Sequence, residues 1–301
     1  MQSEIRNPKS AIQNSISADP DLPIGIFDSG VGGLTVYRAL HERLPDEHFV
    51  YLGDTARVPY GTKSLATVER YAVENSRFLE AHGIKLLVVA CNTASALALP
   101  AIRRAVSVAV IGVIEPGALA AVAAANQQPI AVIATEATIQ SRAYSKAIHR
   151  IDSAIKVVER ACPLFVPLAE EGWADSEVAA IVAEHYLANF RSLESAAMVL
   201  GCTHYPILQN VIRKTMTSDV TLIDSGEATA YQVERLLKKL QLSRSVGPRE
   251  KKEREMCDDL DHFYVTDAAQ RFARVAERFL GVAPSVLEAV EIWGHDELRA
   301  E

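Results

Sequence analysis

Residues 200–206, Leu200-Gly201-Cys202-Thr203-His204-Tyr205-Pro206, place a thiol, a hydroxyl and an imidazole in consecutive positions of the chain. They follow an apolar run, 196–200, that predicts a strand buried on both faces of a parallel sheet. Gly201 permits a sharp exit from the sheet, and a helical pattern resumes over 207–216. Cys202 is therefore predicted at the carboxyl end of a strand, where open α/β sheets bind ligands. The dipole and free N–H groups of the helix N-terminus there favour a thiolate over a thiol.

A second stretch has the same order of features. The apolar run 86–90 is followed by Cys91, Asn92 and Thr93, and a helical pattern then extends over 94–106. A single free cysteine is more often a small buried hydrophobe than a reactive group. Two cysteines at the same strand-to-helix position, each with a threonine nearby, instead favour a two-sided site.

Length and composition indicate a folded protein of one or two domains. The chain has 301 residues, of which 49% are hydrophobic and 23% charged, as is ordinary for soluble globular proteins. The net charge of −7 gives no broad basic surface for nucleic acid. No apolar run is long enough to span a membrane. Residues 1–22 lack the apolar core of a signal peptide, so we expect a cytoplasmic protein.

Cysteine spacing argues against a structural metal. The four cysteines are expected to be reduced in the cytoplasm. None of them forms a C-x-x-C pair, and no matching ligand pair completes a site with Cys202 and His204, so no metal is expected. Cys162 precedes a proline and is interpreted as structural. Cys257 falls in a charged, irregular segment, 243–261, that is expected to be a surface excursion.

Alternating strand and helix patterns with short connections predict an α/β fold with mainly parallel, doubly wound sheets. Because each half of the chain has one strand–cysteine–helix unit, we expect two similar domains that face each other. The expected strands are 24–27, 48–52, 86–90, 108–114, 129–134, 155–159, 196–200, 221–223 and 262–266. The expected helices are 34–44, 67–82, 94–106, 118–125, 139–149, 175–191, 207–216, 227–240 and 268–280.

Polar loops follow the first two expected strands. The turn 28–33, Asp-Ser-Gly-Val-Gly-Gly, lacks the full G-x-G-x-x-G dinucleotide fingerprint, and its aspartate would repel a pyrophosphate. A small ligand fits better, with its amine at Asp28 and its carboxylate at the N–H groups of the turn. The alternative is a plain turn with Asp28 and Ser29 as a helix cap. The loop 53–62 is either a wall of the site or a solvated loop.

Four motifs resemble, in the same order, those of the glutamate racemase family. They are 28–34 (DSGVGGL), 53–61 (GDTAR followed by PYG), 91–94 (CNTA) and 201–206 (GCTHYP). The resemblance extends from about residue 23 to residue 281. It implies an enzyme without cofactor that interconverts L- and D-glutamate and supplies D-glutamate for peptidoglycan. It also implies two α/β domains with the active site in the cleft between them.

The resemblance further implies that the chain returns to its first domain after completing the second. We therefore expect a disordered leader at 1–22, a first domain at 23–115 plus 225–282, a second domain at 116–224 and a C-terminal tail at 283–301. Glutamate is the implied small-molecule partner, and neither nucleic acid nor membrane is expected. A homodimer is one candidate assembly, and the sequence alone leaves the oligomeric state open.

Residue roles also come from the resemblance. Cys91 and Cys202 match the two acid/base residues, Cys91 acting on the D-isomer and Cys202 on the L-isomer. From their positions, Asp28 and His204 are expected to assist proton movement at these two thiols. A further stretch, with Ala134-Thr135-Glu136 where relatives often have a glycine, is similar to one that lines the family's cleft. The expected substrate contacts are Asp28, Ser29, Tyr60, Gly61, Asn92, Thr93, Thr135, Thr138, Thr203 and His204.

Two thiols suit racemisation because a proton leaves one face of Cα and another returns to the opposite face. The same chemistry on aspartate is the nearest alternative. A Cys–His hydrolase or decarboxylase with Cys202 as nucleophile is the second, but it would leave Cys91 idle. A protein that binds an amino acid without catalysis is the third.

Overall fold

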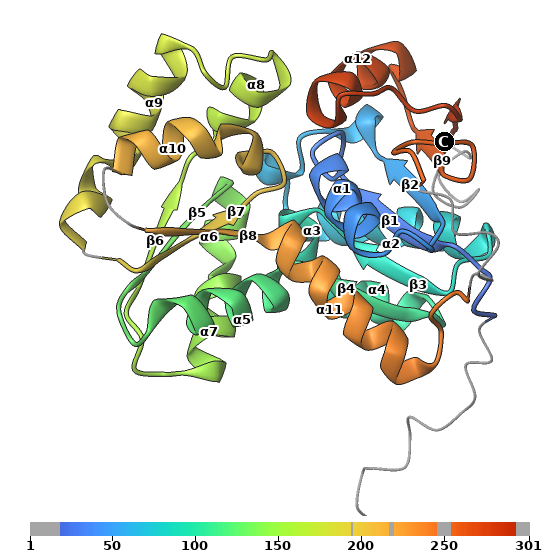
Figure 1. Ribbon diagram of the computed structural model, residues 1–301, viewed down its shortest axis with the longest axis horizontal. Coiled ribbons are helices and arrows are strands. Elements are labelled where there is room, and N and C mark those ends of the chain that lie inside the picture. Colours follow the sequence, from blue (N-terminus) through green and yellow to red (C-terminus); the bar gives the residue numbers. More distant parts are fainter. Residues whose placement is uncertain (1–18, 194, 217–219, 246–253, 293–301) are drawn as a thin grey trace, which may run out of the picture.

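The computed structural model describes residues 19–193, 195–216, 220–245 and 254–292, which form two lobes side by side (Figure 1). The first lobe is built on a six-stranded sheet in the order β10-β9-β2-β1-β3-β4, and the second lobe on a four-stranded sheet in the order β6-β5-β7-β8. All neighbouring strands run parallel. The predicted α/β class with parallel sheets is therefore confirmed.

The bounds of the elements are as follows. The strands are β1 (Ile24–Asp28), β2 (Phe49–Gly53), β3 (Leu86–Val89), β4 (Ala109–Gly112), β5 (Ile130–Ala134), β6 (Val157–Ala161), β7 (Ala197–Gly201), β8 (Thr221–Asp224), β9 (His262–Val265) and β10 (Leu287–Ala289). The α-helices are α1 (Leu34–Arg43), α2 (Leu65–Ala81), α3 (Asn92–Leu97), α4 (Leu99–Ala105), α5 (Ile114–Ala125), α6 (Glu136–Ser141), α7 (Ala143–Ile151), α8 (Phe165–Glu170), α9 (Glu177–Leu187), α10 (Gln209–Met216), α11 (Ser225–Leu240) and α12 (Ala269–Leu280). Short 3₁₀ helices are η2 (Thr55–Arg57), η3 (Tyr60–Thr62), η4 (Ala188–Leu193) and η5 (Tyr205–Leu208).

Both faces of the first sheet are covered by helices. In β3, Leu86 and Val88 pack with residues of α1, α11 and α12, whereas Leu87 and Val89 pack with residues of α2 and α4. Successive side chains of a strand point to opposite faces, so a strand buried on both faces needs an uninterrupted apolar run. This explains why β3 has no polar residue.

The second sheet is covered in the same way. In β7, Val199 packs with residues of α5 and α7, whereas Met198 and Leu200 pack with residues of α8, α9 and α10. The apolar run that precedes Cys202 is therefore the central part of a fully buried strand. Its carboxyl end carries Cys202 to the boundary between the lobes.

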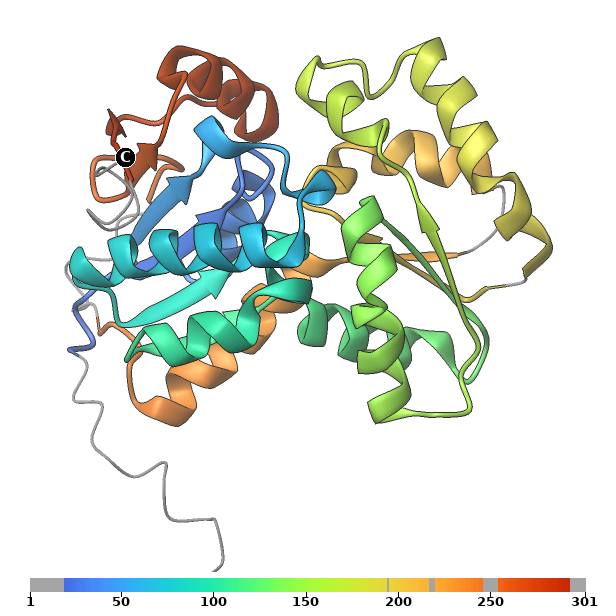
Figure 2. The same ribbon diagram turned by 180° about the vertical axis from the view of Figure 1, so that it is seen from behind.

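Helix α11 connects the two lobes. It begins directly after β8 of the second sheet, where Asp224 accepts a hydrogen bond from the Gly226 N–H at 2.7 Å. It then packs on α1 of the first lobe and on α5, as Figure 1 shows below α1. Figure 2 shows the opposite side of the same boundary, with α12 of the first lobe facing α8 of the second.

Two helices occupy the range in which one, 94–106, was predicted. Helix α3 ends at Leu97, and α4 starts at Leu99 with Pro100 in its first turn. Proline has no backbone N–H to donate, so it fits the first turn of a new helix better than the interior of a longer one. The prediction of a single helix is therefore wrong.

The surface excursion predicted for 243–261 is confirmed only in part, because its C-terminal part is irregular and partly exposed but has buried residues within it. Cys257 is 1% exposed, and its N–H donates to the Tyr37 hydroxyl at 2.8 Å. Arg254 bonds Asp258 and Asp261, so these charges are paired with one another instead of facing water. Residues 246–253 of the predicted excursion lie outside the described residues.

Both ends of the described chain are attached to the first lobe. Residues 287–289, assigned above to a C-terminal tail, form β10 and extend the sheet beside β9. Of the predicted leader, residues 1–18 lie outside the described residues, whereas the Pro20 carbonyl accepts a hydrogen bond from buried Lys85 at 2.5 Å. None of the helices in the described ranges is long and apolar enough to cross a membrane.

Candidate active site

A cavity lies between the two lobes at the carboxyl ends of their central strands. Its volume is about 70 Å³, on a scale where one water molecule needs roughly 10–15 Å³. All the predicted site residues line it except Asp28 and Thr138, which lie buried next to it. The lining residues are Ser29, Gly30, Val58, Pro59, Tyr60, Gly61, Cys91, Asn92, Thr93, Thr135, Val166, Glu170, Cys202, Thr203 and His204.

Cys91 enters the cavity from the first lobe as the N-cap of α3. Its sulfur accepts a hydrogen bond from the Ala94 N–H at 3.5 Å and donates one to Ser29 Oγ at 3.4 Å. Burial and the neighbouring Asp28 carboxylate nevertheless raise the pKa of Cys91 to about 12. The Ala94 N–H at the helix N-terminus lowers the pKa of Cys91, but desolvation and the like charge of Asp28 raise it by more.

Cys202 enters the cavity from the second lobe and contacts a buried histidine. The distance from Cys202 Sγ to His204 Nδ1 is 3.7 Å, and His204 Nε2 lies 3.1 Å from Glu170 Oε1. Burial lowers the pKa of His204, but the hydrogen bonds to Cys202 and Glu170 outweigh it and raise the pKa to about 10. His204 is therefore an imidazolium at neutral pH, and its Nδ1 side faces the Cys202 sulfur.

Glu170 is a site residue that the motif analysis missed. It ends α8, more than thirty positions before His204, and nothing in its local sequence separates it from Glu171. Arg271 of α12 donates to Glu170 Oε2 at 3.1 Å. Burial raises the pKa of Glu170, but His204 and Arg271 lower it by more. Only the fold brings this carboxylate to the imidazole.

Asp28 uses one carboxylate oxygen within its own turn. Oδ2 accepts a hydrogen bond from the Gly30 N–H at 2.9 Å, and Oδ1 has no partner among the described residues. Burial raises the pKa of Asp28, against the opposing effect of His204 and of backbone N–H groups. The helix-cap alternative is not what the structure has, because Gly33 is the N-cap of α1 and α1 has no side-chain cap.

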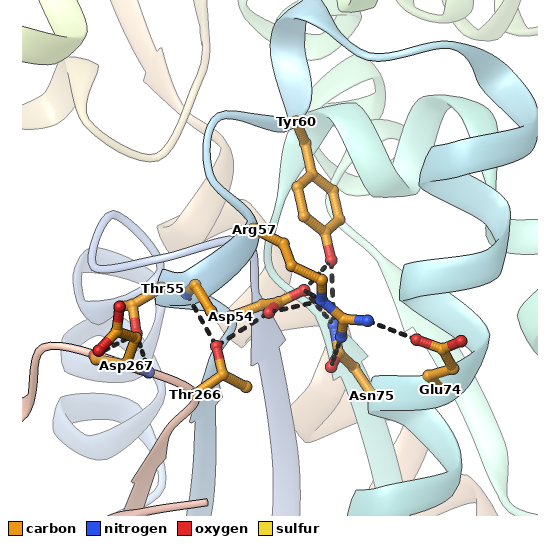
Figure 3. Close-up of polar contacts among 9 residues, drawn as sticks. Asp54, Thr55, Arg57, Tyr60, Glu74, Asn75, Thr266 and Asp267 are labelled. Carbon is orange, nitrogen blue, oxygen red and sulfur yellow. Dashed lines mark hydrogen bonds and ion pairs between the residues drawn. The ribbon is translucent and has the colours of Figure 1, made fainter. Parts of the chain in front are cut away.

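The loop 53–62 is a wall of the cavity and not a solvated loop. Asp54 is fully buried and accepts hydrogen bonds from the Tyr60 hydroxyl, from Arg57 Nε at 2.8 Å and from Thr266 Oγ1 at 3.0 Å (Figure 3). Asn75 of α2 also donates to this carboxylate, at 3.1 Å. These bonds fix Tyr60, and with it Gly61, against the first lobe.

The two lobes touch closely beside the cavity. Thr35 Oγ1 of α1 donates to the Thr203 carbonyl at 2.8 Å. A Cβ atom on Gly32 would lie 2.3 Å from Thr203 Oγ1 and 2.5 Å from the His204 ring, so only glycine permits this approach. At the wall of the cavity, three hydroxyls from both lobes lie 3.1–3.3 Å apart, those of Thr93, Thr135 and Thr138.

This arrangement provides an acid and a base on opposite walls of one cavity. Cys91, whose pKa is raised to about 12, is a thiol that can give a proton, and Cys202 faces it from the other wall beside the His204 imidazolium. Within the described ranges, no group of three or more His, Cys, Asp or Glu residues is arranged to hold a metal ion. The site is therefore suited to proton transfer to and from a small molecule held between the walls.

Comparisons with known proteins agree with this geometry. The family model described as Asp/Glu/hydantoin racemase matches residues 24–233. A glutamate racemase of Geobacter metallireducens is 52% identical over 86% of this chain and 92% of its own, and one of Chlorobium phaeobacteroides is 45% identical over 91% and 98%. A crystal structure of glutamate racemase from Francisella tularensis in complex with D-glutamate has a TM-score of 0.81 and 39% identity, over 91% of this chain and 98% of its own. The chain belongs to the Asp/Glu/hydantoin racemase family.

Proposed function

We propose that this protein interconverts L- and D-glutamate by proton transfer between Cα and the two thiols, without a cofactor. The observation that carries the proposal is that Cys91 and Cys202 line one cavity from opposite lobes, Cys91 beside the Asp28 carboxylate and Cys202 beside the His204 imidazolium. The substrate is proposed from the relatives, which are named glutamate racemases, one of them in complex with D-glutamate. The product D-glutamate would supply peptidoglycan synthesis.

The protons balance in a complete turnover. With L-glutamate bound, the Cys202 thiolate takes the Cα proton and becomes a thiol, while the Cys91 thiol gives its proton to the opposite face and becomes a thiolate. The products are D-glutamate and an enzyme whose two sulfurs have exchanged protonation states. After the product leaves, the Cys91 thiolate takes up a proton from water and the Cys202 thiol releases one, which restores the starting state for the next L-glutamate. The assignment of each thiol to one isomer follows the family pattern.

His204 and Glu170 support the first of these steps. The His204 imidazolium holds the Cys202 thiolate before the reaction, and Glu170 holds the imidazolium on its other nitrogen. As the thiolate accepts a proton, the imidazolium loses its anionic partner on one side only. Glu170 therefore keeps His204 in place through both halves of the turnover.

The deprotonated Cα needs stabilisation through the α-carboxylate. We propose that donors fixed around the cavity supply it, mainly the Asn92 amide and the hydroxyls of Thr93 and Thr203. We propose that Asp28 Oδ1, which has no hydrogen-bond partner among the described residues, accepts a hydrogen bond from the ammonium group of the substrate. The amine would then be held from the first lobe, and the carboxylate from both lobes.

Proton NMR of glutamate in D₂O tests the proposed function. Both L- and D-glutamate should lose their Cα proton signal and their optical purity, and aspartate measured beside them should exchange far more slowly. Dialysis against a chelator should leave the rate unchanged, and the protein should have no pyridoxal absorbance. Binding of glutamate without exchange would contradict the proposal, as would faster exchange of aspartate.

We also propose a cytoplasmic location and a homodimeric assembly. The four cysteines are unpaired thiols, as is usual in a reducing compartment. Large apolar side chains are exposed around α8 and α9, among them Leu164, Trp173 and Ile181, and such patches mark protein contacts. Light scattering of the purified protein measures its assembly, and a monomer at all concentrations would contradict the dimer.

A further inference from the structure

Tyr144 of α7 is a fully buried residue that the motif analysis did not assign to the site. Its hydroxyl donates to Asn92 Oδ1 at 2.7 Å. Tyr144 belongs to the second lobe, whereas Asn92 begins α3 of the first lobe and lines the cavity. This bond therefore crosses from one lobe to the other next to Cys91.

The space for the Tyr144 ring is made by two glycines. A Cβ atom on Gly201 would lie 3.0 Å from Tyr144 Cε2, and one on Gly117 would lie 3.2 Å from Cε1. Gly201 ends β7 immediately before Cys202, and Gly117 lies in the first turn of α5. The ring is therefore held tightly, so its hydroxyl has a fixed position.

The hydroxyl determines which way the Asn92 amide faces. An amide has an oxygen that accepts and a nitrogen that donates, and the two can exchange places by rotation. With Tyr144 donating to Oδ1, the buried Nδ2 has no partner among the described residues. A donor without a partner in the wall of the cavity is suited to an anionic group of a ligand.

Tyr144 keeps the proton that this bond requires. Burial raises the pKa of Tyr144, against a hydrogen bond from Ser225 that lowers it. The hydroxyl is therefore protonated across the range in which proteins are usually assayed. It can act as a donor to Asn92 whatever the state of the two thiols.

We propose that Tyr144 is a positioning residue that turns the Asn92 amide so that Nδ2 binds the carboxylate of the substrate. The inference rests on the proposed function and adds a residue to it. Without the hydroxyl, the amide could rotate and present Oδ1 to the carboxylate, which repels it. Loss of the hydroxyl should therefore weaken both binding and turnover, although Tyr144 itself touches no substrate.

A double-mutant cycle tests this coupling. Tyr144→Phe should raise KM for glutamate and lower kcat/KM by about 10-fold, the effect of one hydrogen bond of roughly 1.4 kcal/mol. Asn92→Ala should lower kcat/KM by at least as much. Adding Tyr144→Phe to Asn92→Ala should change kcat/KM by less than about twofold, because the group through which Tyr144 acts is gone. Independent losses that multiply in the double variant would overturn the inference.

Tyr37→Phe is the matched control. The Tyr37 hydroxyl is also buried and donates to Asp261 at 2.7 Å, but it lies in the first lobe away from the cavity. Its loss should lower the melting temperature and leave KM and kcat per folded molecule unchanged in either Asn92 background. An equal rise in KM for Tyr37→Phe would show that a general loss of stability explains the rise in KM of Tyr144→Phe, and would overturn the inference.

A measurement on the unmodified protein covers the case in which Tyr144→Phe does not fold. The Asn92 side-chain NH₂ signals in a ¹⁵N NMR spectrum are assigned by their absence in Asn92→Ala. D-glutamate should shift these signals, and unchanged signals at saturation would overturn the inference. Failure of the unmodified protein to racemise glutamate would instead contradict the proposed function, so the two failures are distinguishable.

Discussion

At the scale of single residues, the two thiols differ in their neighbours. Cys91 lies beside the Asp28 carboxylate and Ser29, whereas Cys202 lies beside the His204 imidazolium. Burial and the Asp28 carboxylate raise the pKa of Cys91, whereas the charge that faces Cys202 is the positive one of His204. One kind of side chain can thereby serve as acid on one wall and as base on the other.

Replacement of either thiol should stop racemisation. Cys91→Ala and Cys202→Ala should each lower the rate by about 10²–10⁴-fold, the span of one positioned acid or base. The double variant should be scarcely slower than either single one, because the two groups act as a unit. Circular dichroism of glutamate solutions measures the rate. Cys162→Ala, a buried cysteine outside the cavity, is the control and should keep wild-type turnover. A folded Cys91→Ala protein with near wild-type activity would rule out the two-thiol mechanism.

His204 should titrate far above an ordinary histidine. We expect a pKa of about 10 in the folded protein against 6.5 for the unperturbed group. Glu170→Gln and Cys202→Ala should each lower this pKa, because each removes an anionic partner while burial remains. NMR titration of the His204 ring protons measures it, with His204→Asn for assignment. Titration of wild-type His204 near pH 6.5 would contradict the imidazolium.

The raised pKa of His204 makes the free energy of unfolding depend on pH. Because the folded pKa of His204 lies above the unfolded one, its stabilising contribution is complete below pH 6.5 and disappears as the pH rises through about 10. The difference in unfolding free energy between wild type and His204→Asn should therefore shrink from pH 7 to pH 10. Urea unfolding at a series of pH values measures it. A difference that grows with pH would contradict this sign.

The residues of the site could be predicted from the sequence where several of them are consecutive in one motif. Cys91, Asn92 and Thr93 adjoin one another, as do Cys202, Thr203 and His204, and all six line the cavity. Glu170 and Tyr144 could not be found in this way. Each reaches the site by a contact between elements that are distant in the sequence, and neither has a local pattern of its own.

At the scale of elements, buried strands were the easiest to predict. Strands β1, β3, β5 and β7 are apolar because both faces are covered, and each ends at a polar loop. Short elements with few apolar residues have no apolar run by which they could be predicted. β10, Leu287–Ala289, contains one glutamate among three residues and is recognisable only by its pairing with β9.

The loop 53–62 depends on one buried ion pair. Arg57→Leu should destabilise the protein by about 3–5 kcal/mol, because it leaves the Asp54 charge buried without its cation. Tyr60 and Gly61 should also lose their fixed position in the wall of the cavity, so KM for glutamate should rise. Chemical unfolding and steady-state kinetics measure the two effects.

Arg43→Leu is the control for that variant. It breaks the Arg43–Glu234 pair, whose arginine side chain is 40% exposed, and such surface pairs contribute at most about 1 kcal/mol. Asp54→Leu combined with Arg57→Leu should be less destabilised than Arg57→Leu alone, since the fully buried Asp54 charge is then gone and only Glu74, 17% exposed, has lost its cation. Equal losses for Arg57→Leu and Arg43→Leu would contradict the role of the pair.

At the scale of the whole molecule, the cavity exists because the lobes are drawn together. Contacts across the boundary lie around the cavity on several sides: Thr35 with Thr203, Arg271 with Glu170, and Tyr144 with Asn92. Most of them position a residue that lines the cavity. The relative position of the lobes therefore sets the distance between the two thiols.

Two similar units could be predicted from the repeated strand–cysteine–helix pattern, but their contact could not. It depends on single side chains of α1, α7, α8 and α12 that meet residues distant in the sequence, with no local pattern that marks them. Gly32 is an example. In the sequence it is one glycine of a tight turn, and in the structure it is the point where the turn of the first lobe touches Thr203 and His204 of the second.

Gly32→Ala should therefore separate the lobes without unfolding either one. The new Cβ atom would lie within 2.5 Å of Thr203 Oγ1 and of the His204 ring, so the second lobe must move away. A displacement of about 1 Å at a reacting group can cost on the order of 10²-fold in rate. We expect kcat/KM for glutamate to fall by about that factor, the radius of gyration from X-ray scattering to rise slightly, and the melting temperature to change little.

Gly25→Ala is the control: its Cβ atom would lie 2.6 Å from Ile84 in the core of the first lobe. It should lower the melting temperature and leave turnover per folded molecule unchanged. Wild-type kcat/KM in a folded Gly32→Ala protein would show that close contact at this point is not needed for catalysis.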